Sequence, residues 1–163
     1  MAQEINKLRY FVAQFTSQDM EEKYSNIVRV GRNFYYINDD LRNLRTEIQR
    51  DVYSLGIFLG EEKERFYPSP ALVELISKIP DAEKRKVYIN KKAEWLFLCG
   101  RNVLPESISK NPNHLQEGLV LIQNEGDENL GYGEFKKEDK LIIRNLLDKG
   151  RYLRLDEKGR KKR

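Results

Sequence analysis

Apolar positions in the first part of the chain follow first a helical and then a strand-like spacing. They recur at helical intervals near the N-terminus, at Ile5, Leu8, Phe11, Val12 and Phe15. This spacing predicts a packing helix with one apolar face. Two β-prone runs follow at residues 24–30 and 34–38, and the turn residues 31–33 between them predict a β-hairpin.

Polar caps and prolines predict the next elements. Asn38 and the two aspartates after it predict the start of a helix that ends near Arg50. A strand is predicted around residues 54–60, and the prolines in residues 65–70 predict the start of another short helix. Pro80 and the charged residues that follow it end that helix, so we predict a domain junction near residue 86.

After this junction the pattern changes to short strands separated by turns. Strands are predicted at residues 87–90 and 95–99, and a helix of one or two turns at 104–108. Residues 118–124 and 130–135 flank a turn-rich stretch and are predicted to be antiparallel neighbours.

Glycines and a break in the pattern characterise the last part of this region. The glycines within residues 131–133 predict a bend or a close backbone approach. Residues 140–149 are compatible with either a helix or a strand; Gly150 breaks the run, and a final strand is predicted at Tyr152 and Leu153. So many short strands favour a small barrel.

Composition excludes several classes of protein. A chain of 163 residues forms one ordinary domain or two small ones, which rules out a large multidomain enzyme. The 39% hydrophobic content is enough for a core. The longest apolar run without charge, residues 52–60, is far shorter than the ~18 to 20 residues that span a bilayer, so we expect no membrane span and no signal peptide.

The residues offer no catalytic or metal-binding constellation. One cysteine, Cys99, and one histidine, His114, cannot form an internal disulfide or a Cys/His metal cluster. Cys99 is predicted to be a small core residue and His114 a solvated loop side chain, and no phosphate-binding glycine motif is present. We therefore predict no enzyme, no metal, no cofactor and a reducing compartment, with a cytoplasmic location, or a nuclear or nucleolar one in a eukaryote.

Positive charge is concentrated at the C-terminal end. Residues 136–163 hold twelve Lys or Arg against five Asp or Glu, whereas residues 1–86 hold fourteen of each. Such a local excess suits a polyanion, because phosphates that pair with cations release counterions. A solvated basic tail is the alternative explanation.

The candidate RNA-binding residues recur among apolar ones, which indicates a folded basic patch. They are Lys136, Lys137, Lys140, Arg144, Lys149, Arg151 and Arg154. Arginine binds phosphate through two parallel hydrogen bonds, so the arginines are the best candidates for specific contacts, and salt bridges at a solvated surface are the alternative. Tyr132, Tyr152 and Trp95 are candidates for stacking on bases, although Trp95 is predicted to lie in the core.

The second half of the sequence contains, in this order, the segments KKAEWLFLCGRNVLPESI, EGLVLIQNEGDENLGYGEF and DKGRYLRL. Together they resemble the PUA domain, a small pseudo-barrel of RNA-modifying enzymes and ribosome-assembly factors. Upstream, VYSLGIFLGEEKERFYPSPALVELI is similar to the N-terminal domain that accompanies this module in the ribosome-biogenesis family named for nuclear import protein seven. The KERFYPSP form looks archaeal.

This resemblance implies an α+β fold. The expected parts are an N-terminal α/β domain with an antiparallel sheet at residues 1–86, a PUA domain at 87–157 and a disordered basic tail at 158–163. The resemblance implies RNA binding in rRNA processing and large-subunit assembly, without catalysis. The family's RNA surface matches Lys140 and Arg144, with Lys149, Arg151 and Arg154 nearby. The resemblance also makes the loop at Arg101 a secondary RNA-binding candidate. Leu141 stands where the family pattern has another basic residue.

Three functional hypotheses remain open. In the first, the chain is a monomeric RNA-binding adaptor in ribosome biogenesis whose neutral N-terminal domain docks an assembly or RNA-processing protein. In the second, it positions RNA for an RNA-modifying enzyme whose catalytic chain is separate. In the third, it is a protein-interaction factor with an incidental basic tail.

Overall fold

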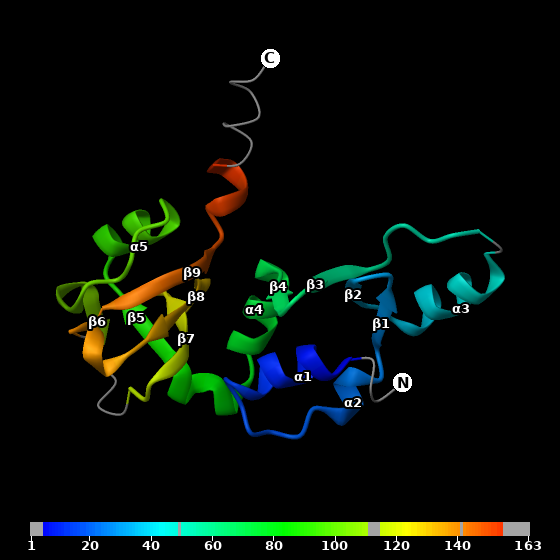
Figure 1. Cartoon of the computed structure of the whole chain (residues 1–163), viewed down its shortest axis with the longest axis horizontal. Helices are drawn as coiled ribbons and strands as arrows, with labels where there is room; N and C mark the ends of the chain where they lie inside the picture. Colours follow the sequence, from blue (N-terminus) through cyan, green and yellow to red (C-terminus); the bar gives the residue numbers. More distant parts are fainter. Residues whose placement is uncertain (1–4, 49, 111–114, 141, 155–163) are drawn as a thin grey trace, which may run out of the picture. The chain divides into compact units, whose positions relative to one another are not determined.

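The computed structural model describes residues 5–48, 50–110, 115–140 and 142–154. The chain divides into two compact units, Met1–Leu72 and Val73–Arg163, and each contains helices and a β-sheet (Figure 1). The predicted α+β class is thus confirmed. Within the described ranges, no helix combines the length and the apolar character needed to cross a membrane.

The first unit contains a four-stranded antiparallel sheet in the order β1-β2-β3-β4. Its strands are β1 (Ile27–Val30), β2 (Asn33–Tyr36), β3 (Ile57–Glu62) and β4 (Phe66–Pro68). The predicted hairpin is confirmed, because β1 and β2 pair in antiparallel register around Gly31. Gly31 has a φ of 59°, a left-handed conformation that glycine adopts without strain.

Three helices belong to this unit: α1 (Asn6–Ala13), α2 (Glu21–Tyr24) and α3 (Asp39–Glu47). The predicted apolar face of α1 is buried, and the ring of Phe11 lies 5.5 Å from that of Phe66 in β4. Asn38 caps α3, since its Oδ1 accepts a hydrogen bond of 3.0 Å from the Leu41 amide. The short helix α2 was not predicted, because its residues precede the first β-prone run without a helical apolar pattern.

The second unit contains a five-stranded mixed sheet in the order β6-β5-β7-β8-β9. Its strands are β5 (Lys86–Ile89), β6 (Ile108–Lys110), β7 (Gly118–Gln123), β8 (Asn129–Phe135) and β9 (Ile143–Asp148). Val103 pairs with Ile143 in β9 at one edge, and the chain reaches β6 at the other edge only a few residues later. This segment therefore closes the sheet into the expected pseudo-barrel.

Glycines in β8 let its neighbour β9 approach closely, as predicted. A Cβ on Gly131, whose φ is 150°, would lie 2.0 Å from the Leu147 carbonyl oxygen, so no side chain fits there. The register of β8 and β9 shifts just beyond it, between Tyr132 and Gly133. The predicted antiparallel pairing of β7 and β8 is also confirmed.

The strand predicted at residues 95–99 is wrong. These residues belong to α5 (Lys91–Leu98) and its C-terminal end, and the side chain of Asn90 caps this helix by accepting a hydrogen bond of 3.0 Å from the Ala93 amide. The helix buries Ala93 and Phe97 and leaves Trp95 67% exposed. The predictions that Trp95 and Cys99 lie in the core are wrong for the same reason, since Cys99 is also exposed.

The final strand predicted at Tyr152 and Leu153 is also wrong, because residues 151–154 are helical. The preceding run, whose apolar pattern fits either a helix or a strand, contains the strand β9. Gly150 lies where a Cβ would be 2.0 Å from the Leu98 carbonyl oxygen. The chain thus passes against the end of α5 at this glycine and turns there instead of extending the sheet.

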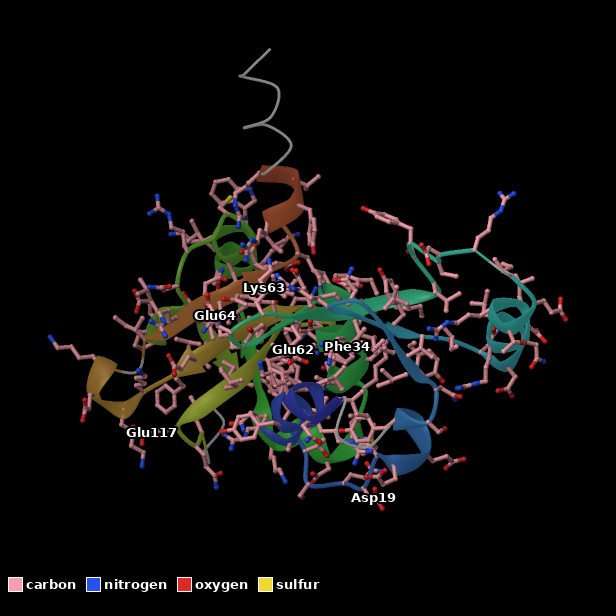
Figure 2. The ribbon with its side chains drawn as sticks, turned by 45° about the vertical axis from the view of Figure 1, so that its right-hand side comes forward. Asp19, Phe34, Glu62, Lys63, Glu64 and Glu117 are labelled. Carbon is pink, nitrogen blue, oxygen red and sulfur yellow. The ribbon has the colours of Figure 1, made fainter. Side chains whose placement is uncertain are left out.

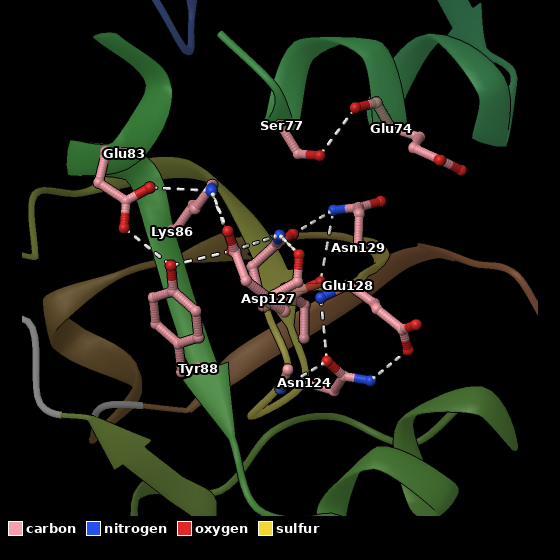
Figure 3. Close-up of polar contacts among 12 residues, drawn as sticks. Glu74, Ser77, Glu83, Lys86, Tyr88, Asn124, Asp127, Glu128 and Asn129 are labelled. Atoms are coloured by element: carbon pink, nitrogen blue, oxygen red, sulfur yellow. Dashed lines mark hydrogen bonds and ion pairs between the residues drawn. The ribbon is translucent and has the colours of Figure 1, made fainter. Parts of the chain in front are cut away.

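The helix α4 (Pro70–Ser77) and the 3-10 helix η2 (Pro80–Arg85) connect the two sheets along the chain. The units divide between Leu72 and Val73, whereas the charged stretch predicted a junction near residue 86. Lys86, at the end of this stretch, forms an ion pair with Asp127 of the second unit (Figure 3). The short helix predicted at residues 104–108 forms η3 (Pro105–Ser107).

Candidate nucleic-acid interface

Three of the candidate lysines lie in the connection between β8 and β9. Lys136 follows β8, Lys137 begins the 3-10 helix η4 (Lys137–Asp139), and Lys140 ends it in a left-handed conformation with a φ of 52°. The Lys137 amide donates a hydrogen bond of 2.8 Å to Oε1 of Glu117, which precedes β7 (Figure 2). This bond holds the connection in place while the three lysines remain exposed.

Arg144 lies on β9 beside these lysines. It is the register partner of Glu134 on β8, and the two side chains form an ion pair. The ammonium of Lys136 lies 3.7 Å from the same carboxylate. The side chain of Arg144 is 60% exposed, so this pair contributes little to stability and leaves the guanidinium accessible to a phosphate.

Arg101 lies in a segment that runs along β9. Asn145 fixes this segment, because its Nδ2 donates hydrogen bonds to the carbonyl oxygens of Phe97 at 2.9 Å and Arg101 at 3.3 Å. The Asn145 amide also donates to Oδ1 of Asn102 at 3.0 Å. The Arg101 side chain is exposed, so the secondary candidate stands on an ordered loop next to the strand that carries Arg144.

Lys149 and Arg151 follow the other end of β9. The Lys149 ammonium lies 2.9 Å from a carboxylate oxygen of Glu74. Hydrogen bonds from Lys149 and Lys78 lower the pKa of the Glu74 carboxyl. Arg151 is exposed and has no ion pair with any residue in the described part of the chain, so its charge is available to a ligand.

Arg154 is held inside the second unit by a bidentate ion pair. Its Nη1 and Nη2 lie 2.9 Å and 2.8 Å from the two carboxylate oxygens of Asp148, whose side chain is only 4% exposed. Nη1 also donates to the Leu98 carbonyl oxygen. The hydrogen bonds to Asp148 raise the pKa of Arg154. This geometry makes Arg154 an anchor between the C-terminal turn and the end of α5.

The structure brings the candidates together in two groups. Arg144 lies toward the beginning of β9, with the lysines of the β8–β9 connection, whereas Lys149, Arg151 and Arg154 follow its end. Arg101 lies between the two groups, because Asn145 binds its carbonyl oxygen and a Cβ on its neighbour Gly100 would lie 3.2 Å from the Arg154 guanidinium. At ~3.3 Å per residue, the strand separates Arg144 from Lys149 by roughly 17 Å. The two groups could therefore contact two different phosphates of one nucleic-acid chain. The eight candidate side chains do not form a single cluster.

Two of the three stacking candidates are exposed, and the sequence pattern wrongly predicted one of them, Trp95, to be buried. Lys91 and Lys92 precede Trp95 by about one turn on the solvent side of α5, and all three are exposed. Tyr152 is 54% exposed, whereas Tyr132, the other stacking candidate, is buried. The signal that could have revealed Trp95 is the Asn90 cap with Ala93 and Phe97 at helical spacing.

The arrangement suits nucleic-acid binding. Exposed arginines and lysines bind phosphates, and an exposed tryptophan or tyrosine stacks on an unpaired base. The described residues contain no group of three His, Cys, Asp or Glu side chains placed to hold a metal ion. His114, Leu141 and the basic tail 158–163 lie outside the described residues.

Comparisons with known proteins agree with this architecture. Residues 2–69 match the family model described as the NIP7/UPF0113 pre-PUA domain, and residues 85–157 match the UPF0113 PUA domain. A UPF0113 protein of Archaeoglobus fulgidus is 26% identical over 162 residues, which cover 93% of this chain and 90% of the relative. Neither matched domain description names an enzyme. With both domains matched in the order that the fold shows, the chain belongs to the NIP7/UPF0113 family.

Proposed function

We propose that the chain is a non-catalytic RNA-binding protein that acts in ribosome biogenesis, in rRNA processing and large-subunit assembly. The PUA domain of its family indicates RNA binding. One observation carries the proposal further: the exposed side chains of Arg144 and Lys136 share a single carboxylate, that of Glu134. Their charge exceeds what this carboxylate neutralises, and such an excess favours a polyanion.

RNA is proposed to bind along β9, from the β8–β9 connection to Arg151. In this proposal Lys136, Lys137, Lys140, Arg144, Arg101 and Arg151 contact phosphates, and Trp95 and Tyr152 stack on unpaired bases. Lys149 and Arg154 act differently, because their ion pairs with Glu74 and Asp148 hold the domain in shape. Specific phosphate contacts are therefore assigned to Arg144 and Arg151 rather than to Arg154.

The experiment is a salt series of single-stranded RNA binding by the intact chain and by a triple variant. Lys140, Arg144 and Arg151 are replaced by alanine, and Arg154 is kept so that the fold is not disturbed. Removing one cation that pairs with a phosphate should reduce the slope of log affinity against log salt by about 0.7. We therefore expect weaker binding and a slope that is less negative by about 2.

A second triple variant serves as the matched control. Replacing Lys63, Lys84 and Lys110 by alanine removes the same charge from exposed positions that form no ion pair with β9 or with a partner of its flanking residues. We expect this variant to keep most of the affinity. Equal losses in the two variants would mean that only net charge matters, and the proposal of a folded binding patch would be abandoned.

The domain limits, location and partners complete the proposal. The first family match ends at residue 69 and the second begins at 85, so the boundary near 86 stays a prediction. We propose a monomeric, archaeal-type protein of the cytoplasm whose N-terminal domain docks an assembly or RNA-processing protein. The alternative is an RNA-positioning subunit of a modification complex, which copurification of a methyltransferase or pseudouridine synthase would favour.

A further inference from the structure

Four arginines line a hollow in the first unit, far from the PUA domain in sequence. Its volume is about 620 Å³, and the arginines come from α1, β1 and α3. Among the described residues that line it, Glu21 alone carries a carboxylate. This concentration of positive charge was not expected, because residues 1–86 are neutral in total.

Two of these arginines are neutralised by carboxylates. Arg9 faces the carboxylate of Glu21 with both terminal nitrogens, and Nη2 lies 2.9 Å from Oε2. Arg29 pairs with Glu62 at 3.3 Å between Nη1 and Oε2 (Figure 2). Both guanidinium groups therefore have an anion already.

The other two arginines, Arg42 and Arg45, have no carboxylate partner among the residues that the structure describes. Nη2 of Arg42 donates hydrogen bonds to the Ser25 carbonyl oxygen at 2.6 Å and to Oδ1 of Asn26 at 3.3 Å, and both acceptors are uncharged. The Arg45 side chain forms no hydrogen bond or ion pair with any residue within the described ranges. No described carboxylate therefore neutralises the positive charge of these two guanidinium groups.

The spacing of this pair also favours an anion. Arg42 and Arg45 stand three residues apart on α3, so their side chains emerge on one face and repel each other. The dipole of α3 favours a cation in the last turn at Arg45, but Arg42 stands a turn earlier. A bound anion between the two guanidinium groups would remove the repulsion.

The rest of the hollow fits a nucleotide unit. Apolar side chains of Ile5, Ile27 and Val28 line it together with the ring of Tyr24. Its volume lies within the ~300 to 1,000 Å³ that small-ligand sites occupy. A phosphate bound by arginine would leave the attached sugar and base against this apolar wall.

We propose that Arg42 and Arg45 bind a phosphate group of a single-stranded RNA, which gives the pre-PUA domain its own RNA contact. This inference rests on the proposed RNA binding and extends it to a second surface. Arginine is suited to this task because its planar guanidinium donates two parallel hydrogen bonds to phosphate oxygens. A free nucleotide carries the same phosphate chemistry and is tested separately.

The test uses the full chain with Arg45→Glu, because Arg45 supports no other described residue. The matched control is Arg50→Glu, which makes the same change of charge at an exposed position outside the hollow. Single-stranded RNA binding is measured over a salt series, and folding is checked by circular dichroism and urea unfolding. We expect R45E to bind RNA about fivefold or more weakly than R50E, with a salt slope less negative by about 0.7. Arg45→Ala should show the same direction with a smaller loss.

Equal RNA affinities for folded R45E and R50E would overturn the inference. Uridine monophosphate is titrated against both variants as well, and Arg45-dependent binding of the nucleotide without an effect on RNA would also overturn the RNA site. The proposed PUA surface is tested independently by the triple variant at Lys140, Arg144 and Arg151. If R45E weakens RNA binding and that variant does not, the PUA proposal fails while this site stands. If the intact chain binds no RNA, both fail.

Discussion

The ammonium of Lys86 lies 2.9 Å from Oδ1 of Asp127 and 2.8 Å from Oε2 of Glu83 in the second unit (Figure 3). The Lys86 side chain is only 6% exposed. The hydroxyl of Tyr88 joins the cluster by donating to Glu83 at 2.7 Å, with Asp127 3.0 Å away. One buried cation thus connects the 3-10 helix η2, the strand β5 and the turn between β7 and β8.

The cluster shifts the pKa of each member. Burial lowers the pKa of Lys86, but hydrogen bonds to Glu83 and Asp127 outweigh it and raise the pKa. Hydrogen bonding to Lys86 lowers the pKa of Glu83. Burial raises the pKa of Asp127, and bonds from Gln123, Lys86 and Tyr88 outweigh it and lower the pKa. Burial, with the two carboxylates, raises the pKa of Tyr88.

These shifts predict a loss of stability in acid. A carboxyl group whose pKa is lower in the folded state stabilises the fold above its unfolded pKa, near 4, and this contribution disappears as the pH falls through the folded pKa. We expect the free energy of unfolding to decrease below about pH 4.5, as measured by urea unfolding between about pH 7 and pH 2.5. In Lys86→Met the decrease should be shallower, and stability at neutral pH should be lower by about 1 to 2 kcal/mol. Parallel curves for the two proteins would contradict the assignment.

Adding one methyl group at Gly131 should strongly reduce the free energy of unfolding. Its φ of 150° is strained for other residues, and a Cβ would lie 2.0 Å from the Leu147 carbonyl oxygen of β9. Gly131→Ala must therefore separate β8 from β9, and we expect a loss of about 3 kcal/mol or more in urea unfolding. Gly126→Ala is the control, because its Cβ would meet a side-chain atom, Oδ1 of Asn124, at 3.3 Å. Equal stability of G131A and G126A would contradict the close approach.

Arg154 and Arg151 should separate stability from RNA binding. Arg154→Ala removes the bidentate partner of the buried Asp148 carboxylate and leaves it a hydrogen bond from Asn145, so we expect a loss of about 2 kcal/mol or more in unfolding free energy. Arg151→Ala removes the same charge from an exposed side chain and should change stability by less than about 0.5 kcal/mol. RNA titration should show the opposite order, with the larger direct loss in R151A. A stable R154A with strongly reduced RNA affinity would make Arg154 a contact residue.

Local patterns along the chain were sufficient for many elements of this fold. The apolar spacing of α1, the cap of α3 and the turn at Gly31 each depend on neighbours in sequence, and each was predicted correctly. The helix α5 was not predicted, because a short apolar run such as WLFL fits both a strand and a buried helix. Only the Asn90 cap distinguishes the two, and it lies outside that run.

The roles of the candidate site residues depend on contacts that sequence spacing does not reveal. Arg154 resembles Arg144 and Arg151 in its sequence surroundings, yet its partners are Asp148 and the carbonyl oxygen of Leu98 on another element. The arginine-lined hollow was not predicted for a similar reason. Its cations come from three elements, and the charge count of the whole half is zero. Only tertiary structure brings them together.

Trp95 gives a direct optical test of the proposed RNA surface. It is the single tryptophan of the chain, and it is 67% exposed on α5, close in sequence to Lys91 and Lys92. If a base stacks on its ring, saturating single-stranded RNA should quench its fluorescence. Trp95→Ala should weaken RNA binding by about 1 kcal/mol or more, roughly fivefold or more, whereas Trp95→Phe should keep part of the affinity because its ring still stacks. Stability should change little in either variant, because an exposed ring adds little to the core. Unchanged emission at saturating RNA, together with full affinity of W95A, would exclude Trp95 from the interface and confine RNA to the cations along β9.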